Sequence, residues 1–247
     1  MNRRLGLAAL IIGLLAASAV AYLIEFLAFG DARDIWFYTI LDFAFLPIQV
    51  ILVAIVIEGL LARHERRQLL RKMNMVIGTF FSELGTRLLG DLTPTLANRG
   101  DVMEALAVRA DWKPADFRRA ETRAAALDYR VNLVGFDLEA LKRDLLGQRN
   151  LLVLLLANPN LLEHERFTDL LWAVSHLGEE LAARPALKDL PTVDREHLEG
   201  DVRRVYSHLA VEWLRYARHL QHSYPYIFSI LVRTHPLQPN PSATVVK

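Results

Sequence analysis

Two stretches with helical periodicity in the C-terminal half of the chain place histidines and carboxylates on one helix face each. Imidazole and carboxylate groups are ligands for zinc, iron and manganese, so two such faces that meet in a helical bundle could bind a metal ion. Spacings of four and seven residues keep each set on one side of its helix. The candidate ligands are Asp169, His176 and Glu180 in the first stretch, and Asp201, His208 and Glu212 in the second.

The sequence motifs that usually mark metal centres and enzymes are absent. The chain has no Glu-x-x-His pair of the di-iron bundle type, no His-Glu-x-x-His, no Gly-rich phosphate loop and no Gly-x-Ser-x-Gly. His219 and His222, three residues apart, form a weaker pair still. Because polar stripes on long helices are usually solvated faces with local ion pairs, the sequence predicts no resident cofactor and disfavours an enzyme.

A second group of candidate residues lies in the apolar N-terminal region. Glu25 and Asp42 occupy similar depths in two apolar stretches, and Gln49 shares a helix face with Asp42. Two carboxylates that approach each other in a membrane would favour a bound proton or cation, which makes these three residues ion or proton candidates. The alternative is that both carboxylates reach interfacial water or pair with Arg33.

Small residues recur every four positions in the first apolar stretch. Ala9, Gly13, Ala17 and Ala21 lie on one gently drifting face. Such stripes let helix backbones approach closely in lipid, so this face is predicted to pack against another helix, either within one chain or between subunits. The alternative is that alanine and glycine are simply common in membrane helices.

Two apolar stretches are long enough to cross a bilayer. Residues 5–24 form 20 consecutive positions without a charge, and this length matches the roughly 30 Å of a hydrocarbon core. Residues 36–61 form a second stretch, which contains Asp42, Glu58 and Pro47. Pro47 is expected to kink this helix, with or without a mechanical role. The sequence therefore predicts a transmembrane hairpin over residues 1–62.

The distribution of basic residues predicts the orientation of this hairpin. Basic residues precede the first stretch and follow the second. They are Arg3 and Arg4 before the first stretch, and Arg63, Arg66, Arg67, Arg71 and Lys72 after the second. The positive-inside rule then places both termini in the cytosol, with anionic lipid headgroups as partners of the second cluster. A cleavable signal peptide, with Ala17-Ser18-Ala19 as its processing site, is the alternative for the first stretch, and it leaves the C-terminal domain in the cytosol.

The remaining chain is predicted to be all-α, as no segment alternates with a period of two. The second stretch should continue as a helix until residues 91–94, and capping patterns place helix starts at Asp101, Pro114 and Asn160. Further helices are expected over residues 137–146, 151–157, 193–222 and 226–232. A cytosolic domain of about six to eight helices over residues 63–235 and a disordered tail over residues 236–247 complete the predicted organisation.

Composition narrows the classes of function. The chain has 247 residues, a formal net charge of +1 and no cysteine. The near-neutral charge argues against a nucleic-acid binder, and the lack of cysteine excludes disulfides, thiolate metal sites and cysteine nucleophiles.

Four segments carry a resemblance to a known family. They are FAFLPIQVILV (43–53), KMNMVIGTFFSELGT (72–86), FTDLLWAVSHLGEEL (167–181) and YPYIFSILVRTHP (224–236). They resemble a family of uncharacterised bacterial and archaeal integral membrane proteins with two N-terminal transmembrane helices and a helical cytosolic domain. The resemblance implies this architecture and brings no activity with it.

Three functional hypotheses follow from the sequence. The leading one is a non-enzymatic, multi-pass protein of the inner (cytoplasmic) membrane that acts as a homo-oligomeric scaffold or as a regulatory subunit, because two spans are too few to enclose a transport path. The second is an oligomeric channel or ion-coupled device that uses Asp42 and Glu25. The third is a membrane-anchored helical-bundle metalloenzyme.

Overall fold

The computed structural model describes residues 2–29, 32–161, 164–238 and 240–244 of the chain. Within these ranges, side chains are described except those of residues 2–11, 25, 28–29, 32–35, 38, 65–72 and 160. The chain forms two compact units, Met1–Arg66 and Arg67–Lys247. The described residues are all-α: they contain no strand beyond one isolated antiparallel bridge between Leu96 and Val131.

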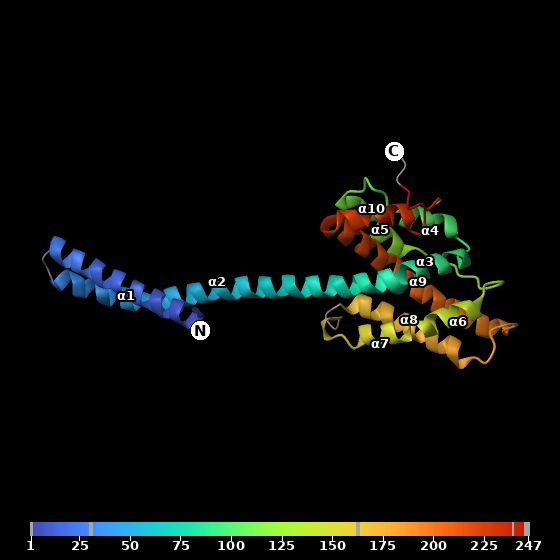
Figure 1. The fold of residues 1–247 in the computed structure, drawn as a ribbon, viewed down its shortest axis with the longest axis horizontal. Coiled ribbons are helices and arrows are strands. Elements are labelled where there is room, and N and C mark those ends of the chain that lie inside the picture. The colour runs from blue at the N-terminus through green and yellow to red at the C-terminus, as the bar shows by residue number, and fades with distance from the viewer. Residues whose placement is uncertain (1, 30–31, 162–163, 239, 245–247) are drawn as a thin grey trace. The chain divides into compact units, whose positions relative to one another are not determined.

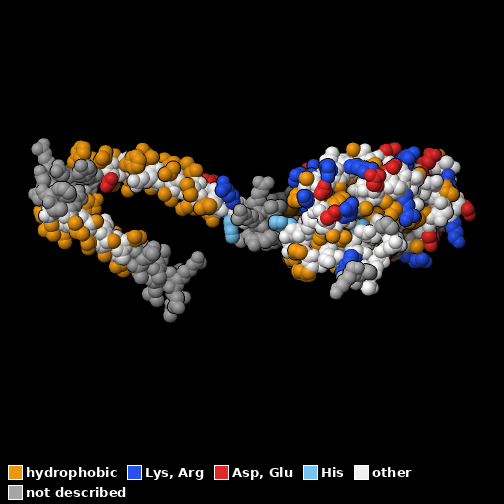
Figure 2. Space-filling view, turned by 90° about the horizontal axis from the view of Figure 1, so that it is seen from above, with side chains coloured by type: hydrophobic (Ala, Val, Ile, Leu, Met, Phe, Trp, Pro, Cys, Tyr) orange, Lys and Arg blue, Asp and Glu red, His pale blue; other side chains and the backbone are white. Residues whose placement is uncertain are grey.

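The first unit contains two apolar helices. Helix α1 spans Asn2–Phe29, and helix α2, which spans Ala32–Phe80 and contains Pro47, begins in this unit. Side chains at 12–24 and 40–64 are exposed, and hydrophobic side chains dominate their surface (Figure 2). Among the described residues, one stretch, Thr39–His64, has the length and hydropathy of a membrane span, and Ile12–Ile24 is a shorter apolar stretch.

The second unit begins with the last part of α2. This helix ends at Phe80 and is followed by a π-helical turn, η1 (Phe81–Gly85), helix α3 (Thr86–Leu92) and a 3-10 turn, η2 (Thr93–Thr95). These consecutive helical elements end at Thr95, close to the end that the sequence predicted at residues 91–94. The hydrophobic spacing did not predict the π-helical turn.

The other helices of the second unit surround α9 (Figure 1). Helices α3, α5, α8 and α10 contact α9, whereas α6 and α7 pack on α8 and α4 packs on α5. Fully buried aromatic residues on α9, Tyr206 and Trp213, lie in the core. The helices are α4 (Arg99–Leu106), α5 (Pro114–Ala126), α6 (Leu138–Gly147), α7 (Arg149–Leu156), η3 (Pro159–Leu161), α8 (Glu165–Ala183), α9 (Thr192–Ser223) and α10 (Pro225–Thr234).

Two predicted helix starts are wrong. Helix α4 begins two residues before Asp101, and its N-cap is Asn98. Helix α8 begins after His164, whose Nδ1 accepts a hydrogen bond from the backbone N–H of Phe167 at 3.1 Å. The imidazole thus performs the capping that the sequence pattern assigned to Asn160.

The remaining helix ends agree with their sequence signals to within a few residues. Pro114 is the first residue of α5, and the Asp137 side chain caps α6 by accepting from the backbone N–H of Ala140. At the C-terminus the packed region continues past the predicted boundary at residue 235. Leu237 is 1% exposed, and Gln238 Nε2 donates to the carbonyl of Val232 at 2.8 Å, so these residues belong to the helical domain.

The π-helical turn makes Gly85 a position where any side chain would clash. A Cβ atom there would lie 2.5 Å from Phe80 Cε1 and 2.7 Å from Phe81 Cδ1. Neither ring can move freely, because Phe80 makes an edge contact with Phe167 and Phe81 stacks on Tyr216. We therefore expect Gly85→Ala to lower the free energy of unfolding by about 1–3 kcal/mol.

Urea denaturation of the two alanine variants Gly85→Ala and Gly100→Ala checks this expectation. Gly100, in helix α4, has open space where a Cβ would be placed, so Gly100→Ala should be neutral or stabilising by up to about 1 kcal/mol. Equal stability of the two variants would show that the aromatic cluster around Gly85 is loosely packed.

Candidate metal centre

The corner between α8 and α9 brings together residues that the sequence separates. Helix α8 ends at Ala183, and after a short loop α9 begins at Thr192 and packs on α8 (Figure 1). Two helices joined by a short loop run antiparallel, so the last turns of α8 lie beside the first turns of α9. Side chains on either side of the loop can therefore meet.

Two histidines and two carboxylates form a closed ring at this corner. His176 Nε2 lies 3.6 Å from Asp201 Oδ1 and 3.9 Å from Glu180 Oε1. His197 Nε2 lies 3.4 Å from Asp201 Oδ2 and 3.5 Å from Glu180 Oε2. Each helix contributes one histidine and, four residues later, one carboxylate, so each imidazole lies between the carboxylates of both helices.

Within this cluster the two carboxylate side chains are more buried than the two imidazoles. The side chain of Asp201 is 4% exposed and that of Glu180 is 28% exposed, whereas His176 and His197 are 43% and 53% exposed. Asp201 is therefore the most deeply buried member of the cluster.

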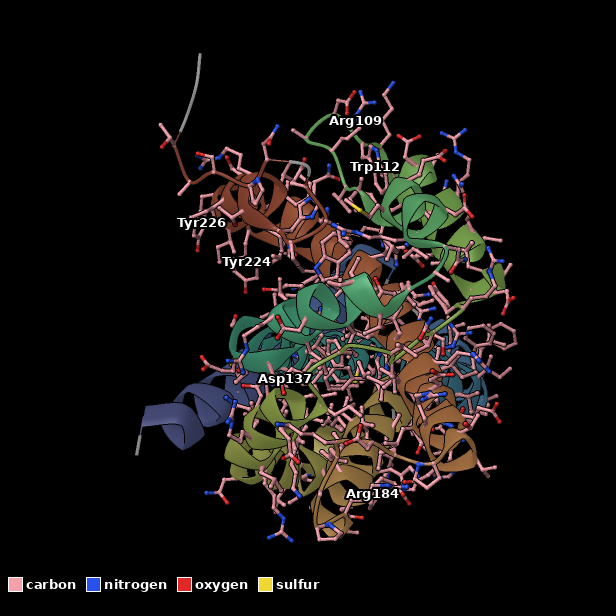
Figure 3. All side chains as sticks on the ribbon, turned by 90° about the vertical axis from the view of Figure 1, so that its right-hand side faces the viewer. Arg109, Trp112, Asp137, Arg184, Tyr224 and Tyr226 are labelled. Carbon is pink, nitrogen blue, oxygen red and sulfur yellow. The ribbon has the colours of Figure 1, made fainter. Side chains whose placement is uncertain are left out.

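Arginine side chains orient both carboxylates. Arg184, labelled in Figure 3, donates from Nη1 to Glu180 Oε2 at 2.8 Å and from Nη2 to Asp194 Oδ1 at 2.6 Å. The hydrogen bond from Arg184 lowers the pKa of Glu180, and the charges of Arg184 and the two nearby imidazoles contribute further. Arg204 Nη1 donates to Asp201 Oδ1 at 3.2 Å. Groups that hold metal-binding carboxylates in place are typical of metal centres.

One oxygen of Asp201 has no hydrogen bond. Among the described residues, no donor pairs with Oδ2, which is buried, and the nearest charged partner recorded is His197 Nε2 at 3.4 Å. A buried carboxylate oxygen without a donor costs about 1–3 kcal/mol or more. A cation between Oδ2 and the His197 ring would remove this cost.

Three members of the ring are close enough together to share one metal ion, and His176 lies beside them. Bond lengths of about 2.0–2.2 Å place neighbouring ligand atoms of tetrahedral zinc about 3.3–3.6 Å apart. The contacts of His197 with Glu180 Oε2 at 3.5 Å and with Asp201 Oδ2 at 3.4 Å have this spacing. One ligand atom from each of Glu180, His197 and Asp201 lies within 4.8 Å of the other two.

Three of the six predicted metal ligands meet at this corner, and three do not. His176, Glu180 and Asp201 come together, whereas Asp169 is exposed elsewhere on α8. His208 and Glu212 line a different cavity on α9. Seven residues along a helix correspond to about 10 Å. This distance is too long for Asp201 and His208 to bind the same metal ion.

The residue missing from the sequence-based set is His197. The signal that could have found it is the pair of His-x-x-x-carboxylate motifs, residues 176–180 and 197–201, placed at similar distances from the loop at residues 184–191. In an antiparallel helix pair, such symmetric placement brings the two motifs side by side.

The other predicted site residues whose side chains are described lie on the two apolar helices. Asp42, Gln49 and Arg63 have exposed side chains on α2, and Ala17 and Ala21 are exposed on α1. A Cβ atom at Gly13 would meet no atom within 4 Å, so at this position α1 has no close neighbour within the described chain. The side chains of the remaining predicted residues lie outside the description: Ala9, Glu25, Arg66, Arg67, Arg71 and Lys72.

The described structure defines an all-helical protein with an apolar N-terminal helical unit and a helical domain that carries a histidine and carboxylate cluster. Residues 5–61 match the family described as MJ1433, N-terminal helical domain, and residues 69–233 match Uncharacterized protein MJ1433, C-terminal helical domain. The chain belongs to this MJ1433 family.

A relative from Methanocaldococcus jannaschii, Uncharacterized protein MJ1433, is 37% identical to the chain over 236 residues. The match covers 96% of this chain and 95% of that protein, so the two share both helical regions. No solved structure matches the chain.

Proposed function

We propose that the protein is a membrane-anchored, non-enzymatic regulatory or scaffold subunit whose helical domain binds a divalent metal ion through His176, Glu180, His197 and Asp201. The observation that carries this proposal is the buried Oδ2 of Asp201, which lacks a hydrogen-bond donor and faces the His197 ring. A bound cation satisfies this oxygen and joins α8 to α9.

The apolar first unit supports the membrane anchor. The stretch Thr39–His64 has a mean hydropathy of 2.6 in its most apolar window and none of that window is buried. Exposed apolar surface of this extent is unfavourable in water but suits lipid. The proposal follows the basic residues in placing both termini in the cytosol, and the open surface at Gly13 is available for a second copy of the chain.

A regulatory role is favoured over catalysis by the way the ligands are held. Glu180 and Asp201 are fixed by arginines, and the four ligands come from two helices that also form the core of the domain. Because metal binding to such a site adds directly to folding free energy, the metal level would control the stability of the domain.

Elemental analysis tests the metal centre and identifies the ion. Full-length protein purified without chelators and dialysed against a mixture of zinc, iron(II) and manganese(II) should retain about one equivalent of metal per chain, with zinc preferred over the other two. The His197→Gln variant should retain essentially none. Wild-type protein that retains no metal after this dialysis would refute the proposed site.

A further inference from the structure

A cavity of ≈ 720 Å³ lies on the opposite half of α9 from the metal centre. Its walls come from the domain part of α2, the start of α5, the N-cap of α8 and the C-terminal half of α9. The lining includes no carboxylate other than Glu212 among the described residues. The residues that the argument uses are Arg118, Arg215, Arg218, His164, His219 and His222.

The guanidinium groups of this cavity have hydrogen-bonding capacity to spare. Arg215 Nη1 donates to Glu212 at 2.6 Å, and Arg215 Nε lies 3.5 Å from Glu121. Arg218 Nη1 lies 2.8 Å from the same Glu121 carboxylate. These carboxylates hold the two side chains, and their recorded contacts use only some of the five N–H donors of each guanidinium. Among the side chains that the structure describes, none forms an ion pair with Arg118 at the cavity wall.

Two of the imidazoles are fixed as donors. His164 Nδ1 accepts from the backbone N–H of Phe167 at 3.1 Å, and His219 Nδ1 lies 3.3 Å from Asn74 Nδ2, which can only donate. With Nδ1 accepting, the proton of each neutral ring must be on Nε2. The described lining of the cavity therefore combines several N–H donors with a single carboxylate, that of Glu212.

We propose that this cavity binds a phosphate group, carried either by a lipid headgroup or by a soluble phosphate compound. A phosphate offers several acceptor oxygens and at least one negative charge, which matches three guanidinium groups and two imidazole donors. The first turn of α5, which begins at Pro114 in the cavity wall, adds the positive end of a helix dipole. A volume of ≈ 720 Å³ is in the range of small-molecule sites.

Titration of pyrophosphate into full-length protein in phosphatidylcholine nanodiscs, followed by calorimetry, tests this proposal. The wild-type protein should bind pyrophosphate. The exposed residues Arg118 and His222 can be changed without breaking an ion pair recorded in the described structure, so Arg118→Gln and His222→Gln should fold. We expect Arg118→Gln to weaken binding by about tenfold or more, because it removes a charge-assisted contact.

Arg119→Gln is the matched control. Arg119 is adjacent to Arg118 on α5, but its side chain is 80% exposed, pairs with Asp116 and does not line the cavity. It should change binding by less than about twofold. Equal losses in Arg118→Gln and Arg119→Gln, or no binding by wild-type protein, would overturn the proposal.

A second set of nanodiscs distinguishes the two sources of phosphate. If a lipid headgroup occupies the cavity, phosphatidylglycerol in the nanodisc should weaken pyrophosphate binding to wild-type protein by competition. If the ligand is soluble, binding should be the same in both lipids. The metal centre is not involved in either outcome, so this test is independent of the proposed function.

Discussion

Zinc is expected to raise the melting temperature of the metal-stripped, full-length protein by about 5–10 °C when free zinc exceeds its dissociation constant about a hundredfold. Binding at that excess stabilises the folded state by about 2.7 kcal/mol, provided the unfolded chain does not bind zinc. In a domain of this size, each kcal/mol corresponds to about 2–4 °C. Differential scanning calorimetry in detergent, with and without zinc, measures the shift.

Single substitutions at the centre are expected to abolish this zinc-dependent shift. His197→Gln removes one ligand from an exposed side chain and should leave the zinc-free melting temperature almost unchanged. Asp201→Asn should also remove the shift, though loss of a buried charge changes the zinc-free protein as well. His208→Gln, on the same helix but outside the ring, is the matched control and should retain the full shift.

The same calorimetry separates a metal centre from a network of ion pairs. If the two imidazoles only pair with Glu180 and Asp201, zinc should have no effect in wild-type protein. A zinc shift that is equal in wild-type protein and in His197→Gln would place the binding elsewhere. Because zinc binds neutral imidazole, the shift should also shrink at acidic pH.

Three of the four ligands of the proposed centre could be predicted from the sequence, because helix periodicity identifies residues that share a face. His176 and Glu180 were found together for this reason. Periodicity does not reveal which turn of one helix faces which turn of the next, so Asp201 was grouped with His208, two turns along α9, rather than with His197, one turn before it. Loop length supplies that information: the short loop at residues 184–191 forces the adjoining turns together.

The helices themselves were largely predictable, and the exceptions have local causes. The predicted ends of α9 agree with the observed ones to within one residue. This agreement arises because the apolar stripe and Pro191 mark the helix clearly. The start of α8 was misplaced because histidine is not among the usual N-cap residues. The π-helical turn at Phe81–Gly85 depends on the packing of Phe80 and Phe81 against distant residues, which no local pattern contains.

Helix α9 links the two proposed sites. His197 and Asp201 lie near its start and Arg215 lies in its second half. Fourteen residues of helix correspond to about 21 Å, so the two ligands cannot touch. Occupation of either site would still stabilise the same helix, and zinc and pyrophosphate should therefore each raise the melting temperature of the domain.

Replacing Ile51 and Ile55 together by arginine is expected to prevent the full-length chain from inserting into membranes. Both side chains are exposed near the middle of the apolar stretch Thr39–His64. Each arginine near the centre of a membrane helix costs about 2.5–3.5 kcal/mol for insertion, and two such costs would outweigh much of the benefit of the remaining apolar residues. The measurement is flotation of alkaline-washed membranes on a sucrose gradient, which separates inserted protein from aggregates.

The matched control uses the same helix and the same spacing outside the apolar stretch. Met75 and Thr79 are exposed on α2 and four residues apart, so Met75→Arg with Thr79→Arg adds two charges without entering lipid. This variant should float with the membranes as wild-type protein does. Release of wild-type protein by the alkaline wash would show peripheral attachment. Equal flotation of the two double variants would show that Thr39–His64 does not cross the bilayer, because a span could not accept two central arginines without loss.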